Sequence, residues 1–97
     1  MPTFPFQVEV VDPGGRFVMC RELERNRFQL VAGSQLGGVE VTHATQPLAT
    51  GSDGDPRVDL YLFRLKRPED AQRFKVGETV MLTAEQAPRL TLPDLLK

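Results

Sequence analysis

VDLYLFRLKRPEDAQRFKVGETVML, residues 58–82, is the stretch that decides the fold class of this chain. The runs VDLYLFRL and FKVGETVML have the length of strands, and they flank the short polar segment LKRPEDAQ. Pro68 can open one helical turn in that segment, with Glu69 and Asp70 near the favourable positive end of the helix dipole. The turn is too short to be a domain element. The unit is therefore strand, turn, strand, and it is typical of a small β-barrel.

The two runs differ in how they distribute apolar side chains. One face of the first run carries Val58, Leu60 and Leu62, and the other carries Asp59, Tyr61 and Phe63. Two apolar faces indicate a strand that is partly covered on both sides, or one with an exposed aromatic patch. In the second run a tight turn at 76–78 leads into a strand at 79–83.

Period-two alternation and turn residues predict the other strands. They are expected at residues 4–10, 16–23, 27–32 and 39–45. In the first of them Phe4, Phe6, Val8 and Val10 would share the buried face. Turn signals stand at 13–15 and 33–38, where glycines can adopt positive φ. The polar run ATGSDGDPR, residues 49–57, predicts an exposed loop.

Six or seven short strands with Gly and Pro at the joints indicate an all-β chain, a small antiparallel β-barrel. At 97 residues, one core and a single domain over 1–97 are expected, with 83–97 as a short C-terminal tail. That tail could add an edge strand at 89–92. Hydrophobic residues make up 40% and charged residues 26% of the chain, the balance of a soluble globular protein.

Charge and cysteine content restrict the function classes. The formal net charge is −1, so the field of the whole molecule would not gather nucleic acid, and any such contact must be local. The single cysteine, Cys20, excludes an internal disulfide and any metal site with two or more thiolates. With no apolar run suited to a signal peptide or a membrane span, we expect a cytoplasmic protein without membrane contact.

No residue cluster has the spacing of a catalytic, cofactor or metal site. His43 has no nucleophile or orienting group assigned to it, and Cys20 has no activating signature, so both are interpreted as ordinary strand residues. Asp53 and Asp55 suggest a calcium loop only superficially, because Pro56 follows where oxygen ligands are needed. The run GSQLGG, residues 33–38, has no following helix or lysine and is interpreted as a hairpin turn rather than a phosphate loop.

The order of the segments resembles the second domain of translational GTPases such as elongation factor Tu, a six-stranded β-barrel. The matching pieces are FQVEV at 6–10, GGR at 14–16, RELERN at 21–26, GVE at 38–40, LYL at 60–62, KRPEDA at 66–71 and VGETVML at 76–82. The chain departs from the family at Cys20 and Asn26, where glycines are usual. It also lacks the G-x-x-x-x-G-K-[ST] motif, so the resemblance implies a freestanding, translation-protein-like barrel without a GTPase domain. In that family the barrel helps to bind the GTPase domain and the acceptor end of tRNA.

These observations predict a non-enzymatic binding module that serves a protein or RNA-containing complex, with a protein partner, RNA as a further partner class and no cofactor. Tyr61, Phe63 and Arg64 form the candidate interface, since exposed aromatics contribute disproportionately to binding. The structural alternative is that the two rings cover a sheet face or meet the C-terminal tail.

Two other function classes stay open. A small nucleic-acid-binding barrel would need aromatic and basic residues interleaved on one sheet face, and Arg16, Arg21, Arg25 and Arg27 gathered on one side. A small enzyme would have to assemble its site from residues without a sequence signature, such as Asp59 with His43. The oligomeric state is not determined by the sequence.

Overall fold

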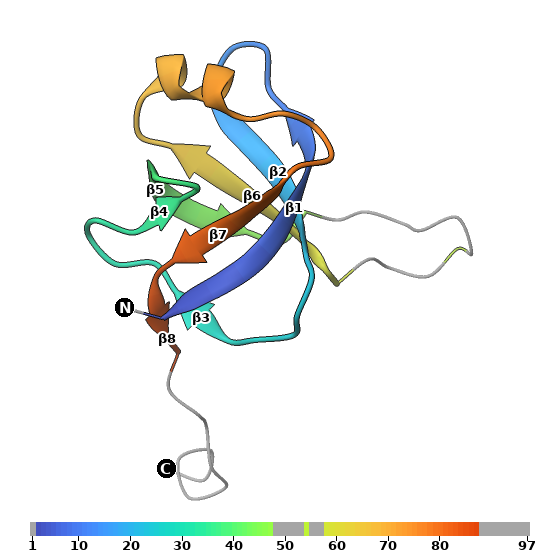
Figure 1. The fold of residues 1–97 in the computed structure, drawn as a ribbon, viewed down its shortest axis with the longest axis vertical. Helices are drawn as coiled ribbons and strands as arrows, with labels where there is room; N and C mark the ends of the chain where they lie inside the picture. Colours follow the sequence, from blue (N-terminus) through green and yellow to red (C-terminus); the bar gives the residue numbers. More distant parts are fainter. Residues whose placement is uncertain (1, 48–53, 55–57, 88–97) are drawn as a thin grey trace, which may run out of the picture.

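The computed structural model describes residues 2–47, 54 and 58–87, and their strands close into one antiparallel barrel (Figure 1). The elements are β1 (Thr3–Val11), β2 (Phe17–Glu22), β3 (Phe28–Gln29), β4 (Gln35–Leu36), β5 (Val39–Thr45), β6 (Leu60–Leu65), the 3₁₀ helix η1 (Pro68–Arg73), β7 (Thr79–Thr83) and β8 (Glu85–Gln86). Around the barrel the order is β1, β2, β6, β5, β4, β7, while β3 and β8 pair separately as a two-stranded sheet. The predicted fold class, a small all-β barrel, is confirmed.

The core lies inside the barrel and is built from alternate residues of the strands. Its fully buried large side chains are Phe6, Val8, Val18, Cys20, Leu36, Val39, Phe63 and Leu82. Each points inward because successive side chains of a strand face opposite sides of the sheet. The predicted strand at 79–83 is confirmed as β7, and its Val80 and Leu82 are both buried.

The prediction for β1 is wrong at Val10, because the strand contains a bulge. Phe4, Phe6 and Val8 are buried as expected, but the pairing with β2 shifts register between Val8 and Val10. One extra residue in a strand reverses the faces beyond it. Val10 is therefore 40% exposed, and Val11 packs against the core in its place.

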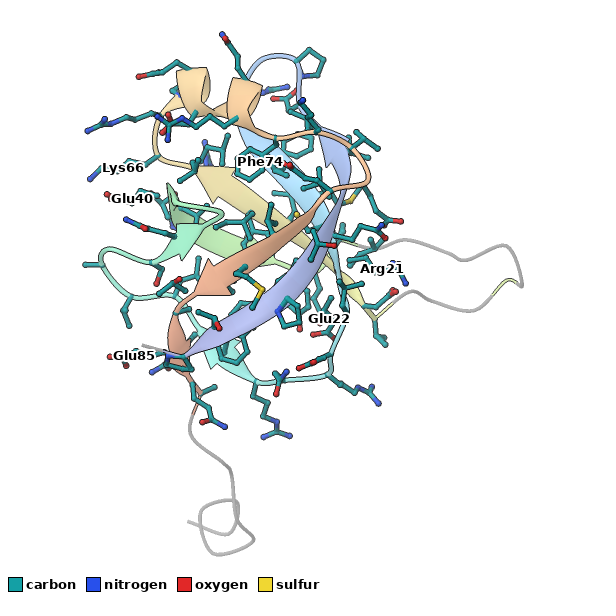
Figure 2. The ribbon with its side chains drawn as sticks, viewed as in Figure 1. Arg21, Glu22, Glu40, Lys66, Phe74 and Glu85 are labelled. Carbon is teal, nitrogen blue, oxygen red and sulfur yellow. The ribbon has the colours of Figure 1, made fainter. Side chains whose placement is uncertain are left out.

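Each end of the barrel is covered by a different element (Figure 1). At one end η1 and the β1–β2 turn lie together, and Ala71 and Phe74 are buried there (Figures 1 and 2). Gly15 has φ +76, and a Cβ on it would lie 2.3 Å from the carbonyl oxygen of Pro68. Only glycine permits so close an approach of the turn to η1. The predicted helical turn with Pro68 at its start is confirmed as this 3₁₀ helix.

At the opposite end the β3–β8 sheet covers the barrel. The half-buried ring of Phe28 lies 5.7 Å from the rings of both Phe4 and Phe6, centroid to centroid. The predicted third strand at 27–32 is therefore only partly right: two residues form β3, and they lie outside the barrel. Its partner β8 was not predicted by any periodicity, because two residues are too few to show one.

The run at 33–38 contains a strand as well as a turn. Gln35 and Leu36 form β4, and only Gly37 and Gly38 make the connection to β5. Both glycines have positive φ, 59° and 84°, as a two-residue hairpin requires. The predicted strand at 39–45 is confirmed as β5. The predicted loop at 49–57 and the edge strand at 89–92 fall outside the described residues, apart from Gly54.

Candidate functional site

The three residues of the candidate interface predicted from the sequence do not lie on one face of the sheet. Phe63 has no exposed surface, and Tyr61 is half-buried and packs against the core. Arg64 points to the outside and is exposed. The prediction of one exposed surface formed by these three residues is wrong, because Tyr61 and Phe63 pair with the inward-facing Cys20 and Val18.

The rings instead form an aromatic cluster inside the β3–β8 end. Phe63 and Tyr61 each meet Phe6 edge to face, with centroids 5.1 and 5.7 Å apart. Phe28 lies 5.1 Å from Tyr61 and 6.1 Å from Phe63. Offset and edge-to-face arrangements at these distances are the favourable ones for aromatic pairs. The structural alternative considered above, rings covering a sheet face, is what the structure contains.

The outer side of the same strands carries an apolar row. Val10 of β1 pairs with Met19 of β2, and Met19 pairs with Leu62 of β6. Met19 and Leu62 are half-buried, and Val10 is the exposed residue that the bulge turns outward. Cross-strand neighbours on one face lie about 5 Å apart, so these three side chains form a continuous strip.

Arginines lie in the rows on either side of this strip. Phe17 pairs with Arg64 in one row, and Arg21 pairs with Leu60 in the other. We call the outward residues Val10, Phe17, Met19, Arg21, Leu62 and Arg64 the β2–β6 wall. In Figure 1, β1 and β7 cross the front of the view, and β2 and β6 lie behind them.

A hollow of 270 Å³ opens at one edge of the wall. It is lined by Phe17, Leu62, Arg64 and Arg16, the residue just before β2. The guanidinium Nε of Arg16 is held 3.1 Å from Asp12 Oδ2. That carboxylate also accepts the backbone N–H of Arg16 and, chiefly for this reason, its pKa lies below the usual value of an aspartate.

The cations of the wall differ in how they are engaged. Arg21 donates from Nη2 to the side-chain oxygen of Gln7 at 2.6 Å, which leaves its charge uncompensated by that contact. The guanidinium of Arg64 has no ion-pair or hydrogen-bond partner within the described part of the chain. The outward positions of β2 and β6, from Phe17 to Arg21 and from Leu60 to Arg64, include no carboxylate.

The four arginines that a nucleic-acid surface would need divide into two pairs. Arg21 belongs to the β2–β6 wall, and Arg16 lines the hollow at its edge. Arg25 and Arg27 line a separate cavity of 480 Å³ with Glu22, Asn26, Gln46, Val58 and Tyr61. Burial raises the pKa of Glu22, and a nearby Asp59 adds to this effect. The lining of that cavity carries both positive and negative side chains, and it shares no residue with the β2–β6 wall.

The residues considered for catalysis are not brought together. Cys20 is fully buried in β2, and burial raises the pKa of its thiol to about 12, with Glu9 and Glu78 adding to the effect. His43 is exposed, pairs with Arg64, and lies 3.0 Å from Thr42 Oγ1 through Nδ1. Asp59 lies just before the first residue of β6. It is therefore about 16 Å along the strand from Arg64, the residue opposite His43. Cys20 and His43 are strand residues, as interpreted from the sequence. Asp53 and Asp55 lie outside the described residues.

The comparisons with known proteins identify no relative: no family model, no curated protein and no solved structure matches this chain. Among the described residues, no group of three or more His, Cys, Asp or Glu side chains could hold a metal ion. No helix in that part of the chain is long and apolar enough to cross a membrane.

The sequence contained one signal for the wall that strand periodicity alone could not interpret. Phe17, Met19 and Arg21 alternate with the buried Val18 and Cys20, so both faces of β2 are largely apolar. Which face is inside follows only from the pairing with β1 and β6. The bulge that adds Val10 to the wall has no signature in the sequence.

Proposed function

We propose that this protein is a non-enzymatic binding module that holds a protein partner on the β2–β6 wall. The observation that carries the proposal is a three-strand apolar strip flanked by two arginines on one outer face. Among the described residues Arg64 has no ion-pair partner, and Arg21 is bonded to the neutral side chain of Gln7. Such a face has no role in the core, since the interior of the barrel is already filled by the inward residues of the same strands.

The composition of the wall supports a protein partner. Aromatic residues, Met and Arg are enriched at protein interfaces, while Lys, Glu and Asp are depleted. The wall contains Phe17, Met19, Arg21 and Arg64, and it contains none of the depleted types. Arginine is also a frequent source of binding energy in interface centres, where water is excluded around it.

A nucleic-acid partner is less well supported. Single strands bind to positively charged grooves in which successive bases stack on aromatic rings. The wall offers one half-buried ring, Phe17, and its other apolar members are aliphatic. Of the two rings that the sequence suggested for stacking, Phe63 has no exposed surface, and Tyr61 is half-buried, packs against the core and is not part of the wall.

Affinity purification from the protein's own cells tests the proposal when wall variants are compared with matched controls. The test variants are Val10→Asp and Arg64→Glu. Met81→Asp is the control for the first, because Met81 is 42% exposed on β7 and Val10 is 40% exposed on β1. Arg67→Glu is the control for the second, because Arg67 is exposed beside η1 and its new carboxylate would suit the start of that helix.

We expect the wild type and both controls to recover the same partner, and both wall variants to lose it while their urea unfolding midpoints stay close to that of the wild type. Recovery that is equal for all five proteins would contradict the proposal. Recovery that disappears on nuclease treatment would assign the wall to nucleic acid instead.

A further inference from the structure

We infer that the partner segment is extended and acidic, with the pattern acidic, any residue, large apolar, any residue, acidic. This inference rests on the proposed function and specifies the chemistry of its partner. The pattern follows from the charge of the wall, from the size of its hollow and from the spacing of its two arginines.

The charge of the wall selects an acidic partner. The chain as a whole carries a net charge of −1, whereas the outward residues of β2 and β6 include two arginines and no carboxylate. Arg64 has no described partner, and Arg21 is bonded to the neutral amide of Gln7. Arg16 contributes less, because Asp12 already pairs with it. A guanidinium binds a carboxylate through two parallel hydrogen bonds, which makes Arg64 and Arg21 the expected anchors.

The hollow selects an apolar side chain next to those carboxylates. Its volume of 270 Å³ lies below the range of about 300–1,000 Å³ usual for small-molecule sites. Phe17 and Leu62 supply an apolar lining, and the aliphatic stems of the arginines extend it. A hollow of this kind suits one side chain of a partner better than a whole small ligand.

The spacing of the arginines selects an extended conformation. In the β2–β6 register, Arg64 is opposite Phe17, Leu62 is opposite Met19, and Leu60 is opposite Arg21. The two arginines are therefore two rows apart, about 14 Å between Cα atoms when the strand rise and the strand separation are combined. Residues i and i+4 of an extended segment span about 13 Å and point to the same side.

A segment lying along the wall would thus place one carboxylate over Arg64 and the other over Arg21. Its central residue, i+2, would then meet the row of Met19 and Leu62, beside the hollow. In a helix the same five residues would span only about 6 Å and could not reach both arginines.

Selection of a random displayed peptide library on the immobilised chain tests this inference. Peptides that also bind a double variant, which carries both Arg21→Glu and Arg64→Glu, are removed first. The remaining peptides then depend on the two arginines. We expect the enriched peptides to share the acidic, apolar, acidic pattern at alternate positions. Enrichment of peptides without acidic residues, or no enrichment at all, would overturn the inference.

Binding of one enriched peptide is then measured by fluorescence anisotropy. Arg64→Glu should weaken binding at least about tenfold, because the attraction at one of the two anchors becomes a repulsion. The two acidic residues of the peptide are each changed to Lys in turn, and one of the two changes should restore binding to Arg64→Glu. Arg67→Glu should bind like the wild type. Failure of the charge exchange to restore binding would contradict the assigned pairing.

These outcomes separate the two proposals. If the cellular partner is lost from Val10→Asp but the selected peptides are not acidic, the wall is an interface and the partner chemistry is wrong. If neither the cellular partner nor the peptides depend on the wall, both proposals fail. If a fluorescent oligouridine binds the wild type but not Arg64→Glu, the partner of the wall is a nucleic acid and not an acidic peptide.

Discussion

Replacing Phe63 by Ala tests the central correction that the structure makes to the sequence-based site. If the ring were part of an exposed interface, its removal would weaken binding and leave stability nearly unchanged. In the structure the ring has no exposed surface, and it meets Phe6 edge to face at 5.1 Å. Its removal should therefore mainly reduce the free energy of unfolding.

The magnitude follows from the buried area. An aromatic side chain buries about 150–250 Å², which at about 25 cal/mol per Å² corresponds to about 4–6 kcal/mol as an upper bound. Measured Phe→Ala changes in protein cores cost about 3–5 kcal/mol. A domain of this size has a stability of about 5–15 kcal/mol, so Phe63→Ala should remain folded only if the wild type lies above the lower part of that range.

Urea unfolding followed by circular dichroism measures this cost, with Phe63→Leu, which removes fewer atoms than Phe63→Ala, as the comparison. We expect a loss of about 3–5 kcal/mol for the alanine variant and a smaller loss for the leucine variant. The corresponding fall in melting temperature for the alanine variant is at least about 12 °C. A loss below about 1 kcal/mol for Phe63→Ala would refute the placement of this ring in the core.

Three further predictions test other parts of the fold. Gly15→Ala should be clearly more destabilising in urea than Gly33→Ala: both glycines have positive φ, but an added Cβ meets backbone only at Gly15, so equal costs would contradict the close contact with η1. Cys20, with its thiol pKa raised to about 12 by burial, should react with a disulfide reagent at pH 8 at least about a thousandfold more slowly than in urea, and rapid reaction of the native protein would place it at the surface. Asp12 has a lowered pKa, so its stabilising effect is complete above about pH 4 and is lost as the pH falls through the lowered value. The difference in stability between the wild type and Asp12→Asn should therefore shrink in that acid range, and a difference that grows there would contradict the assignment.

Local chemistry made much of the fold predictable. The alternation of apolar residues in β1 and β7, the glycine turn before β2 and Pro68 at the start of η1 each act over a few neighbouring residues. Periodicity and turn preferences report such short-range constraints directly. The two-residue strands β3, β4 and β8 have no such signal, because long-range pairing stabilises them.

The candidate site was less predictable for a related reason. Tyr61 and Phe63 alternate with Leu60 and Leu62, so both faces of β6 appear equally suited to the interior. An apolar face is buried or exposed according to what packs against it, and nothing within β6 itself contains that information.

The pattern of residues along the chain was sufficient to predict an all-β protein with one core, and it placed the main strands, the glycine turns and the short helix close to their observed positions. Each of these depends on the conformational preferences and alternation of adjacent residues. Three features became visible only in the folded barrel: which face of β2 and β6 is inside, the bulge that turns Val10 outward, and the position of Arg21 and Arg64 on either side of one apolar strip. Contacts between residues far apart in the chain set the strand register and the closure of the barrel, and a change of one residue in register exchanges the two faces of a strand.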